Sequence, residues 1–298
     1  MRENKPPLRT SGQQFYSRSM LGTFTRQEVL RGQIIRINPA LITITDSQVN
    51  KVAPEKLQHQ VETRVQQLLV YGLKTFHVDV NFEDYSGYGA LRPDLNEVIF
   101  TPLFLQGLKR LVHEHGGYLN LHLLTDFPAQ HFSDYQAVEA DAICFQLESL
   151  PNGFQLAALI EMIQRSGACA SPVIETVGSD GLVPPNPESV FSRLKPLLAE
   201  VGMLTLQVAG TTSRSNTAAG SLAIEQARAY IDALRPSFAG TLQFQGGITT
   251  RTIGQAVRLG AEFVVCGTEI FRNREGRTAE AVIDELLQQA AQALLGSG

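Results

Sequence analysis

The 298-residue chain contains no tryptophan, only three cysteines, and few charged or aromatic side chains (18% and 7%). No apolar run reaches the roughly 18 residues that a membrane-spanning helix needs, so no membrane association is expected. The first residues, MRENKPPLRTSGQQF, also lack the apolar stretch of a signal peptide. A formal net charge of −4 gives no basic surface for nucleic acid. These absences predict a soluble globular protein and give no indication of a nucleic-acid or membrane partner.

The three cysteines, Cys144, Cys169 and Cys266, are odd in number and lack the spacing of a metal site. Two of them lie in the apolar runs AICFQ and FVVCG. We therefore expect small buried hydrophobic residues, and a cytoplasmic protein that has no need of disulfides.

A repeating pattern begins at about residue 33, after a polar segment, residues 1–32, that we interpret as an N-terminal extension outside the core fold. Short β-branched apolar runs alternate with longer segments of helical period in the remaining part, residues 33–298. The predicted strands are 34–44, 74–80, 118–124, 142–148, 171–177, 203–208, 241–246 and 262–267. The predicted helices are 55–72, 101–117, 129–139, 154–167, 187–201, 222–235, 250–260 and 279–294. Such alternation favours a parallel sheet of the α/β class, and eight repeats favour a single closed (β/α)8 TIM barrel. A doubly wound open sheet is the alternative.

Local signals agree with two of these helices. Gly72 can end the helix 55–72, since glycine adopts the left-handed conformation of a helix C-cap. Thr101 is a candidate N-cap, with Pro102 at the first helical position, and Gly116 and Gly117 follow at the end.

Polar side chains at the C-terminal ends of the predicted strands are the candidate active-site residues, because barrel enzymes place their sites there. His77 and Asp79 share one face of the second strand, and His122 lies near the end of the third. Two imidazoles and a carboxylate could bind zinc, iron or manganese, although an inward histidine can also be a hydrogen-bonded core residue. Further polar candidates on later strands are Gln146, Glu148, Glu175, Gln207, Gln243 and Gln245.

Two glycine-containing pairs follow the seventh and eighth strands, namely Gly246-Gly247 and Gly267-Thr268. Glycine lets the backbone approach a ligand closely, and barrels often hold a phosphate between these two loops. The two pairs therefore predict a phosphate site.

Several motifs, in order over about residues 34–271, resemble the ribulose-phosphate 3-epimerase family. INPALITI is similar to the family's first strand, FHVDV to its HxDxMDG motif, and LNLHLL to its DVHLM strand. FQGGIT and LGAEFVVCGTEIF resemble the family's VDGGI and AGAD.fVaGsaiF segments. The resemblance implies epimerisation next to the carbonyl of a ketose phosphate by two carboxylates on opposite faces, a divalent metal that stabilises the enediolate, and a homo-oligomer.

Carried over by position, the resemblance implies metal ligands at His77, Asp79 and His122, with Asp79 also an acid/base. It implies a phosphate cradle at Gly246, Gly247, Gly267 and Thr268. The second catalytic aspartate is replaced by Gln245, which cannot transfer protons as a carboxylate does. The chain departs from the family pattern at four other places. Ala40 replaces a serine, and Gln146 replaces a histidine, whereas Glu148 is retained. The segment VNFEDYSG replaces VMDG, and VAGTTSRSN, which contains Arg214, replaces PGFGGQ.

Two hypotheses follow. In the first, the chain is a divergent sugar-phosphate epimerase or isomerase in which Glu148, Glu175 or Asp126 supplies the second proton relay. In the second, the barrel binds a sugar phosphate without two-base epimerisation, and it is regulatory or catalyses a one-base enolisation or lyase reaction.

Overall fold

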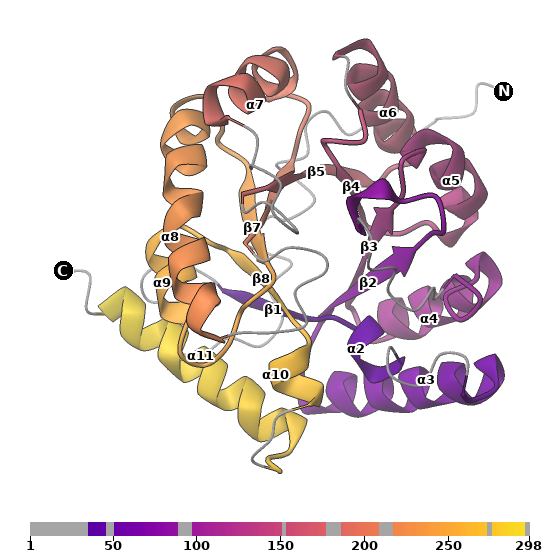
Figure 1. Ribbon diagram of the computed structural model, residues 1–298. Coiled ribbons are helices and arrows are strands. Elements are labelled where there is room, and N and C mark those ends of the chain that lie inside the picture. The colour runs from indigo at the N-terminus through magenta and orange to yellow at the C-terminus, as the bar shows by residue number, and fades with distance from the viewer. Residues whose placement is uncertain are drawn as a thin grey trace, which may run out of the picture.

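Eight parallel strands form the centre of the molecule and helices surround them, as the ribbon of the computed structural model shows (Figure 1). The structure describes residues 35–45, 51–88, 97–150, 153–176, 186–208, 217–272 and 276–295. In the sheet the strands follow the order β1-β8-β7-β6-β5-β4-β3-β2. The predicted (β/α)8 TIM barrel is therefore confirmed, whereas the predicted extension, residues 1–32, and Arg214 lie outside the described residues.

The strands and helices have the following bounds. The strands are β1 (Arg36–Pro39), β2 (Thr75–Asn81), β3 (Tyr118–Leu124), β4 (Ala142–Gln146), β5 (Cys169–Glu175), β6 (Met203–Gln207), β7 (Thr241–Gln245) and β8 (Phe263–Cys266). The α-helices are α2 (Ile42–Thr45), α3 (Pro54–Tyr71), α4 (Pro102–Glu114), α5 (Pro128–Tyr135), α6 (Gly153–Arg165), α7 (Pro187–Leu194), α8 (Thr217–Leu234), α9 (Ile253–Arg258), α10 (Thr268–Phe271) and α11 (Ala279–Leu295). Short 3-10 turns are η3 (Ser86–Tyr88), η4 (Gln136–Val138), η5 (Lys195–Leu197) and η6 (Arg235–Ser237).

The first and second strands meet at a single parallel bridge between Ala40 and His77, and this bridge brings the two ends of the sheet together. The backbone N–H of Leu41 donates to the carbonyl of His77 over 2.9 Å, and the chain then turns into α2. The predicted strand 34–44 is therefore wrong in its second half. Its β-branched residues favour a strand locally, but no neighbouring strand is available beyond the bridge.

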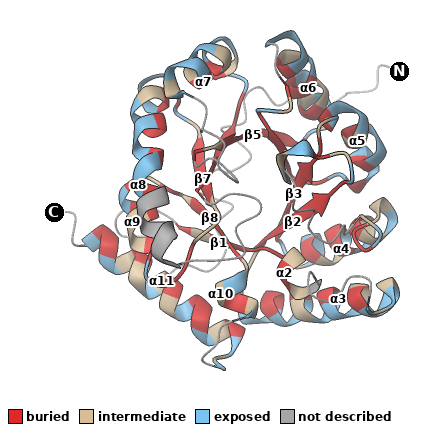
Figure 2. Cartoon of the chain, in the orientation of Figure 1, coloured by how far each residue is buried: buried red, intermediate tan, exposed pale blue. Residues whose placement is uncertain are grey.

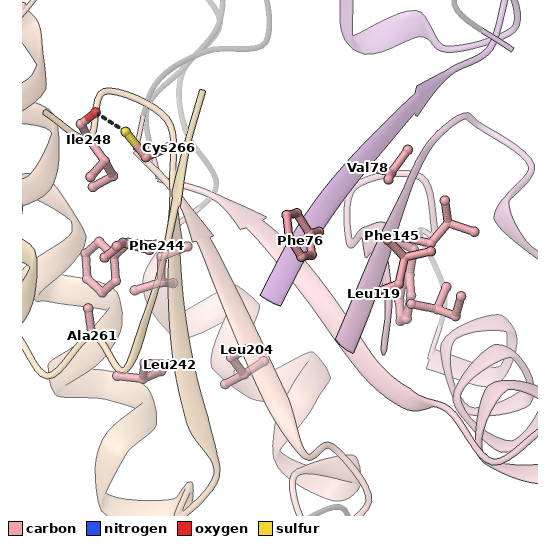
Figure 3. Packing of buried hydrophobic residues seen from close by; sticks show 14 of the residues in the cluster. Phe76, Val78, Leu119, Phe145, Leu204, Leu242, Phe244, Ile248, Ala261 and Cys266 are labelled. Carbon is pink, nitrogen blue, oxygen red and sulfur yellow. Dashed lines mark hydrogen bonds between the residues drawn. The ribbon is translucent and has the colours of Figure 1, made fainter. Parts of the chain in front are cut away.

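Alternate residues of each strand pack outward beneath the helices. Phe76 and Val78 of β2, Leu119 of β3, Phe145 of β4 and Phe244 of β7 all belong to one buried cluster (Figure 3). The helices bury one face against this layer and expose the other, as the banded colouring shows (Figure 2). Because side chains alternate along a strand, the residues between these hydrophobic positions point into the barrel. That inner face carries the candidate site.

Two predicted elements end earlier in the structure than expected. We expected Gln146 and Glu148 to share a face of the strand 142–148, but β4 ends at Gln146, which is buried, and Glu148 is exposed beyond it. The helix 187–201 also ends early, at Leu194, and continues as a 3-10 turn containing Pro196. Proline lacks the N–H that would continue the helical hydrogen bonds.

The cysteine and cap predictions are confirmed. All three cysteines are buried and free, and the thiol of Cys266 donates to the carbonyl of Ile248 over 3.3 Å (Figure 3). Gly72 caps α3 in the left-handed conformation, with φ of 116°. Within the described ranges, no helix has the length and apolar character needed to cross a membrane.

Replacing Thr101 by alanine should lower the free energy of unfolding by about 1 kcal/mol, a typical value for a lost N-cap. Its hydroxyl accepts a hydrogen bond from the backbone N–H of Phe104 over 3.3 Å, at the start of α4. Denaturant unfolding of Thr101→Ala and Thr101→Ser checks this. Equal losses in both variants would show that the hydroxyl is not what stabilises the helix.

Candidate functional site

One carboxylate oxygen, Oδ1 of Asp79, is the centre of the polar cluster inside the barrel. It lies 3.2 Å from Nε2 of His77 and 2.9 Å from Nδ1 of His122. The amide nitrogen of Gln245 donates to the same oxygen over 3.0 Å and lies 3.3 Å from Nδ1 of His122. The structure thus brings together three residues that the sequence predicted as one site and a fourth from β7.

Strand register explains this convergence. His77 and Asp79 are two residues apart on β2, so they share its inner face, and Asp79 pairs with His122 of β3 in the sheet. Gln245, at the end of β7, reaches the same oxygen from a strand that is not adjacent to β2. Closure of the barrel is what brings it there.

The charge state of Asp79 follows from its surroundings. Burial raises the pKa of this carboxyl, but the charge of His77 and hydrogen bonds from His122 and His77 lower it more. The net result is a pKa well below the ordinary value for aspartate. Asp79 is therefore an ionised carboxylate near neutral pH, available as a proton acceptor or as a metal ligand.

The donor set fits a divalent metal. One ligand atom from each of His77, Asp79 and His122 lies within 4.8 Å of the others, and all three residues are buried. Imidazole nitrogen and carboxylate oxygen are ligands of zinc, iron and manganese alike. Among the described residues, Nδ1 of His77 and Oε1 of Gln245 are buried and have no hydrogen-bond partner. The role of His77, Asp79 and His122 as metal ligands remains a prediction.

A second ring of polar side chains surrounds His122, and the sequence alone did not indicate its connections. Oε1 of Gln146 lies 3.2 Å from Nε2 of His122. The amide nitrogen of Gln146 donates to the hydroxyl of Tyr85 over 2.9 Å and to Oε1 of Gln207 over 3.3 Å. Tyr85 was missed because it follows β2 in a segment with no periodic pattern. Only its place in the diverged VNFEDYSG segment could have indicated it.

Beneath this ring buried amides and hydroxyls lie on the strands. A small apolar cluster lies on β4, β5 and β6 as well, formed by Ala142, Cys144, Cys169, Val173 and Met203. Oε1 of Gln243 accepts from Asn38 over 2.9 Å and from Asn120 over 3.4 Å. Its amide nitrogen donates to Thr205 over 3.1 Å. Barrel interiors are usually filled by branched apolar residues. Here part of the interior is instead a hydrogen-bonded polar layer, whose directional bonds connect four of the strands.

The other carboxylates lie at the rim. An oxygen of Glu148 accepts from the backbone N–H of Glu175 over 3.4 Å, and Asp126 accepts from the N–H of Ser86 over 3.1 Å. Desolvation raises the pKa of Glu148, although the side chain is exposed to solvent. The two observations agree if solvent reaches one side of the carboxyl while protein crowds the others.

The predicted phosphate cradle has two halves. Gly246 and Gly247 both have positive φ, 88° and 63°, which other residues adopt only with strain. The hydroxyl of Thr252 donates to the carbonyl of Gly247 over 2.8 Å and accepts from the N–H of Thr249 over 2.8 Å. These bonds fix the loop after β7. Binding of phosphate there remains a prediction.

Gly267 has a different constraint, and replacing it by alanine should destabilise the fold. A Cβ at this position would lie 2.1 Å from Oγ1 of Thr43 and 3.0 Å from Cβ of Ala40. Forcing such overlap costs about 1–3 kcal/mol. Denaturant unfolding measures the loss, and Thr43→Ala in the same chain should recover part of it. Equal stability of Gly267→Ala and the wild type would contradict this packing.

A model of the ribulose-phosphate 3 epimerase family matches residues 52–271, which is most of the chain. The chain belongs to this family. A ribulose-phosphate 3-epimerase from Candida glabrata is 24% identical over 155 residues. That match covers 52% of this chain and 55% of the Candida protein, so the chain spans about half the length of the curated relative it matches.

Solved structures support the same fold. A 3-hexulose-6-phosphate synthase from Salmonella typhimurium aligns with a TM-score of 0.55 at 12% identity, covering 88% of this chain and 100% of that chain. A tryptophan synthase from M. tuberculosis aligns with a TM-score of 0.56 at 11% identity, covering 89% and 96%. At such low identity these likenesses concern the barrel and not the reaction.

Proposed function

We propose that this member of the epimerase family acts on a ketose phosphate by metal-assisted proton transfer at the carbon next to the carbonyl. The observation that carries the proposal is the ionised Asp79, which lies inside the barrel between His77 and His122. A buried carboxylate with two imidazole neighbours suits both proton abstraction and cation binding. Family membership supports the sugar phosphate as the class of small-molecule partner.

In this proposal the residues of the site have the following roles. Asp79 takes the proton from the carbon next to the carbonyl. His77, Asp79 and His122 would hold a divalent metal, which, when bound, stabilises negative charge on the substrate oxygens. The phosphate would lie against the backbone of Gly246-Gly247 and Gly267-Thr268, after β7 and β8. The buried polar layer below excludes bulk water from the underside of the site.

This chain differs from a two-carboxylate epimerase in the residue that would return the proton. The amide of Gln245 can donate a hydrogen bond to a substrate oxygen but cannot act as an acid or base. A carboxyl at the rim would have to protonate the second face. The candidates for this carboxyl are Glu148, Glu175 and Asp126, and burial raises the pKa of Glu148, which is the direction of change that a proton donor needs.

One observation favours a second function. Gln245 donates directly to Asp79, so the position that would carry the opposing acid is occupied by a group that fixes the base. A reaction needing one base only, such as enolisation or carbon–carbon cleavage, or binding without turnover, fits this arrangement. A cytoplasmic location and a homo-oligomer, with neither nucleic acid nor membrane as partner, remain predictions.

Solvent deuterium exchange tests the proposal. Wild-type protein loaded with Mn²⁺ or Zn²⁺ would be incubated in D₂O with a panel of pentulose and hexulose phosphates. We expect exchange of the α-proton with at least one of them. Inversion at that carbon would indicate epimerisation, and exchange with retention would indicate one-base chemistry. No exchange with any member of the panel would exclude proton transfer at the α-carbon and would leave carbon–carbon cleavage or the binding role.

A further inference from the structure

A glutamate lies between the two segments that the proposed function assigns to the phosphate. Glu269 directly follows Gly267-Thr268, in the short helix α10. Its Oε1 accepts a hydrogen bond from the hydroxyl of Thr250, in the loop after β7, over 3.2 Å. The carboxylate therefore joins the loop after β7 to the loop after β8, and its negative charge lies beside the place proposed for an anion.

A carboxylate in this place opposes phosphate binding. A phosphate monoester carries between one and two negative charges at neutral pH, and like charges repel. The side chain of Glu269 is only 19% exposed, so solvent screens its charge less than that of a surface carboxylate. The site needs a positive charge that offsets Glu269.

Arg277 supplies that charge. Nη2 of Arg277 lies 3.5 Å from Oε1 of Glu269, and the arginine side chain is 25% exposed. The other terminal nitrogen, Nη1, donates to Oε2 of Glu285 on α11, which packs against α10 (Figure 1). Arg251 and Arg272, the arginines nearest to the two loops in the sequence, are exposed, so water screens them more strongly. Helix α11 thus holds a partly buried guanidinium against the carboxylate of Glu269.

We infer that Arg277, held by Glu285, neutralises Glu269 and so strengthens the binding of a phosphate monoester between the loops after β7 and β8. Arg277 acts through Glu269 and is a positioning residue. The inference rests on the phosphate site of the proposed function, but it does not depend on the reaction.

The structure allows the charge of Glu269 to be separated from its structural role. The bond between Thr250 and Glu269 is one of several links between the two loops, because β7 and β8 pair directly and the thiol of Cys266 donates to the carbonyl of Ile248 over 3.3 Å. Glutamine has the shape of glutamate and keeps an oxygen that can accept from Thr250. Glu269→Gln should therefore leave both loops in place and remove only the charge.

The test is a titration with inorganic phosphate, followed by the backbone ¹⁵N–¹H signals of Gly246-Gly247 and Gly267-Thr268. These signals report both the affinity and the place of binding, and we expect them to shift in the wild type. Arg277→Gln should bind phosphate about tenfold more weakly, the order expected for one partly screened unit charge. Arg277→Lys keeps the positive charge and should retain most of the affinity.

Two further variants distinguish charge from structure. Glu269→Gln should bind phosphate at least as tightly as the wild type, and weaker binding would overturn the inference even if Arg277→Gln does not fold. The double variant Arg277→Gln/Glu269→Gln removes both charges and should recover the affinity lost in Arg277→Gln. A double variant that binds as weakly as Arg277→Gln would show that Arg277 supports the loops only, which would overturn the inference.

Arg235→Gln is the matched control, because Arg235 pairs with Glu262 over 3.7 Å and the change in net charge is the same. Glu262 directly precedes β8, so this pair lies at the end of the barrel opposite the site. Arg235→Gln should keep wild-type phosphate affinity. Equal weakening in Arg235→Gln and Arg277→Gln would overturn the inference, as would a wild type whose glycine signals do not respond to phosphate. Deuterium exchange is a separate readout, so the proposed reaction can fail while this inference holds.

Discussion

Asp79→Asn should lower the rate of α-proton exchange by about 10²–10⁴-fold, the usual contribution of a general base. Asparagine has nearly the same shape and can keep hydrogen bonds in the cluster, but it cannot accept the proton. Asp79 is 6% exposed and its oxygen is the common partner of His77, His122 and Gln245, so no other described carboxylate takes its place among them. The measurement is deuterium incorporation into the reactive ketose phosphate with Mn²⁺ or Zn²⁺ present.

Asp141→Asn is the matched control. Asp141 is also buried, at 7% exposure, and also faces a histidine, since both of its oxygens lie 3.1 Å from Nε2 of His113. It directly precedes β4 and therefore lies at the end of the barrel opposite the site. Asp141→Asn should cost stability and leave exchange in the folded fraction unchanged. Equal loss of exchange in both variants would mean that general damage to the barrel, and not a missing base, explains the effect.

Gln245→Asp should produce the second large effect, a gain of about 10²-fold or more in inversion at the α-carbon. The new carboxyl would stand on β7, across the barrel from β2, where it could protonate the face that Asp79 does not reach. Two neighbouring carboxylates repel, which raises the pKa of one of them and favours the protonated form needed for donation. The measurement is the ratio of inverted to retained product in D₂O.

Gln245→Asn distinguishes the effect of the new carboxyl group from the effect of shortening the side chain. It has the length of aspartate but no proton to transfer, so it should not increase inversion. If the wild type already inverts as fast as Gln245→Asp, another acid must return the proton. Glu148→Gln would then be expected to abolish inversion while leaving exchange intact.

The sequence was sufficient to predict the barrel and the centre of the site. The two-residue spacing of His77 and Asp79 placed both on one face of a strand, and the run containing His122 placed the third residue on the neighbouring strand. Register within the sheet then required the contact that the structure contains. These features depend on periodicity and strand order, which a sequence carries directly.

Features that depend on tertiary contact were not predictable in the same way. Ile42–Thr45 has the composition of a strand, yet it is helical because the chain turns where β1 meets β2. The bonds of Gln146 to Tyr85 and Gln207 join three segments with no shared pattern. Glu148 was placed on a strand that ends two residues earlier, and element ends are the least certain part of any prediction from sequence.

A crystal structure with Mn²⁺ and a ketose phosphate tests most directly whether the barrel is a metal-assisted sugar-phosphate site. We expect anomalous scattering from manganese beside His77, Asp79 and His122, and the phosphate against Gly246-Gly247 and Gly267-Thr268. The carbon next to the carbonyl should lie within hydrogen-bonding reach of Asp79, about 3 Å. Neither manganese at the histidines nor phosphate at the glycine turns, in a crystal grown with both present, would contradict the proposed function.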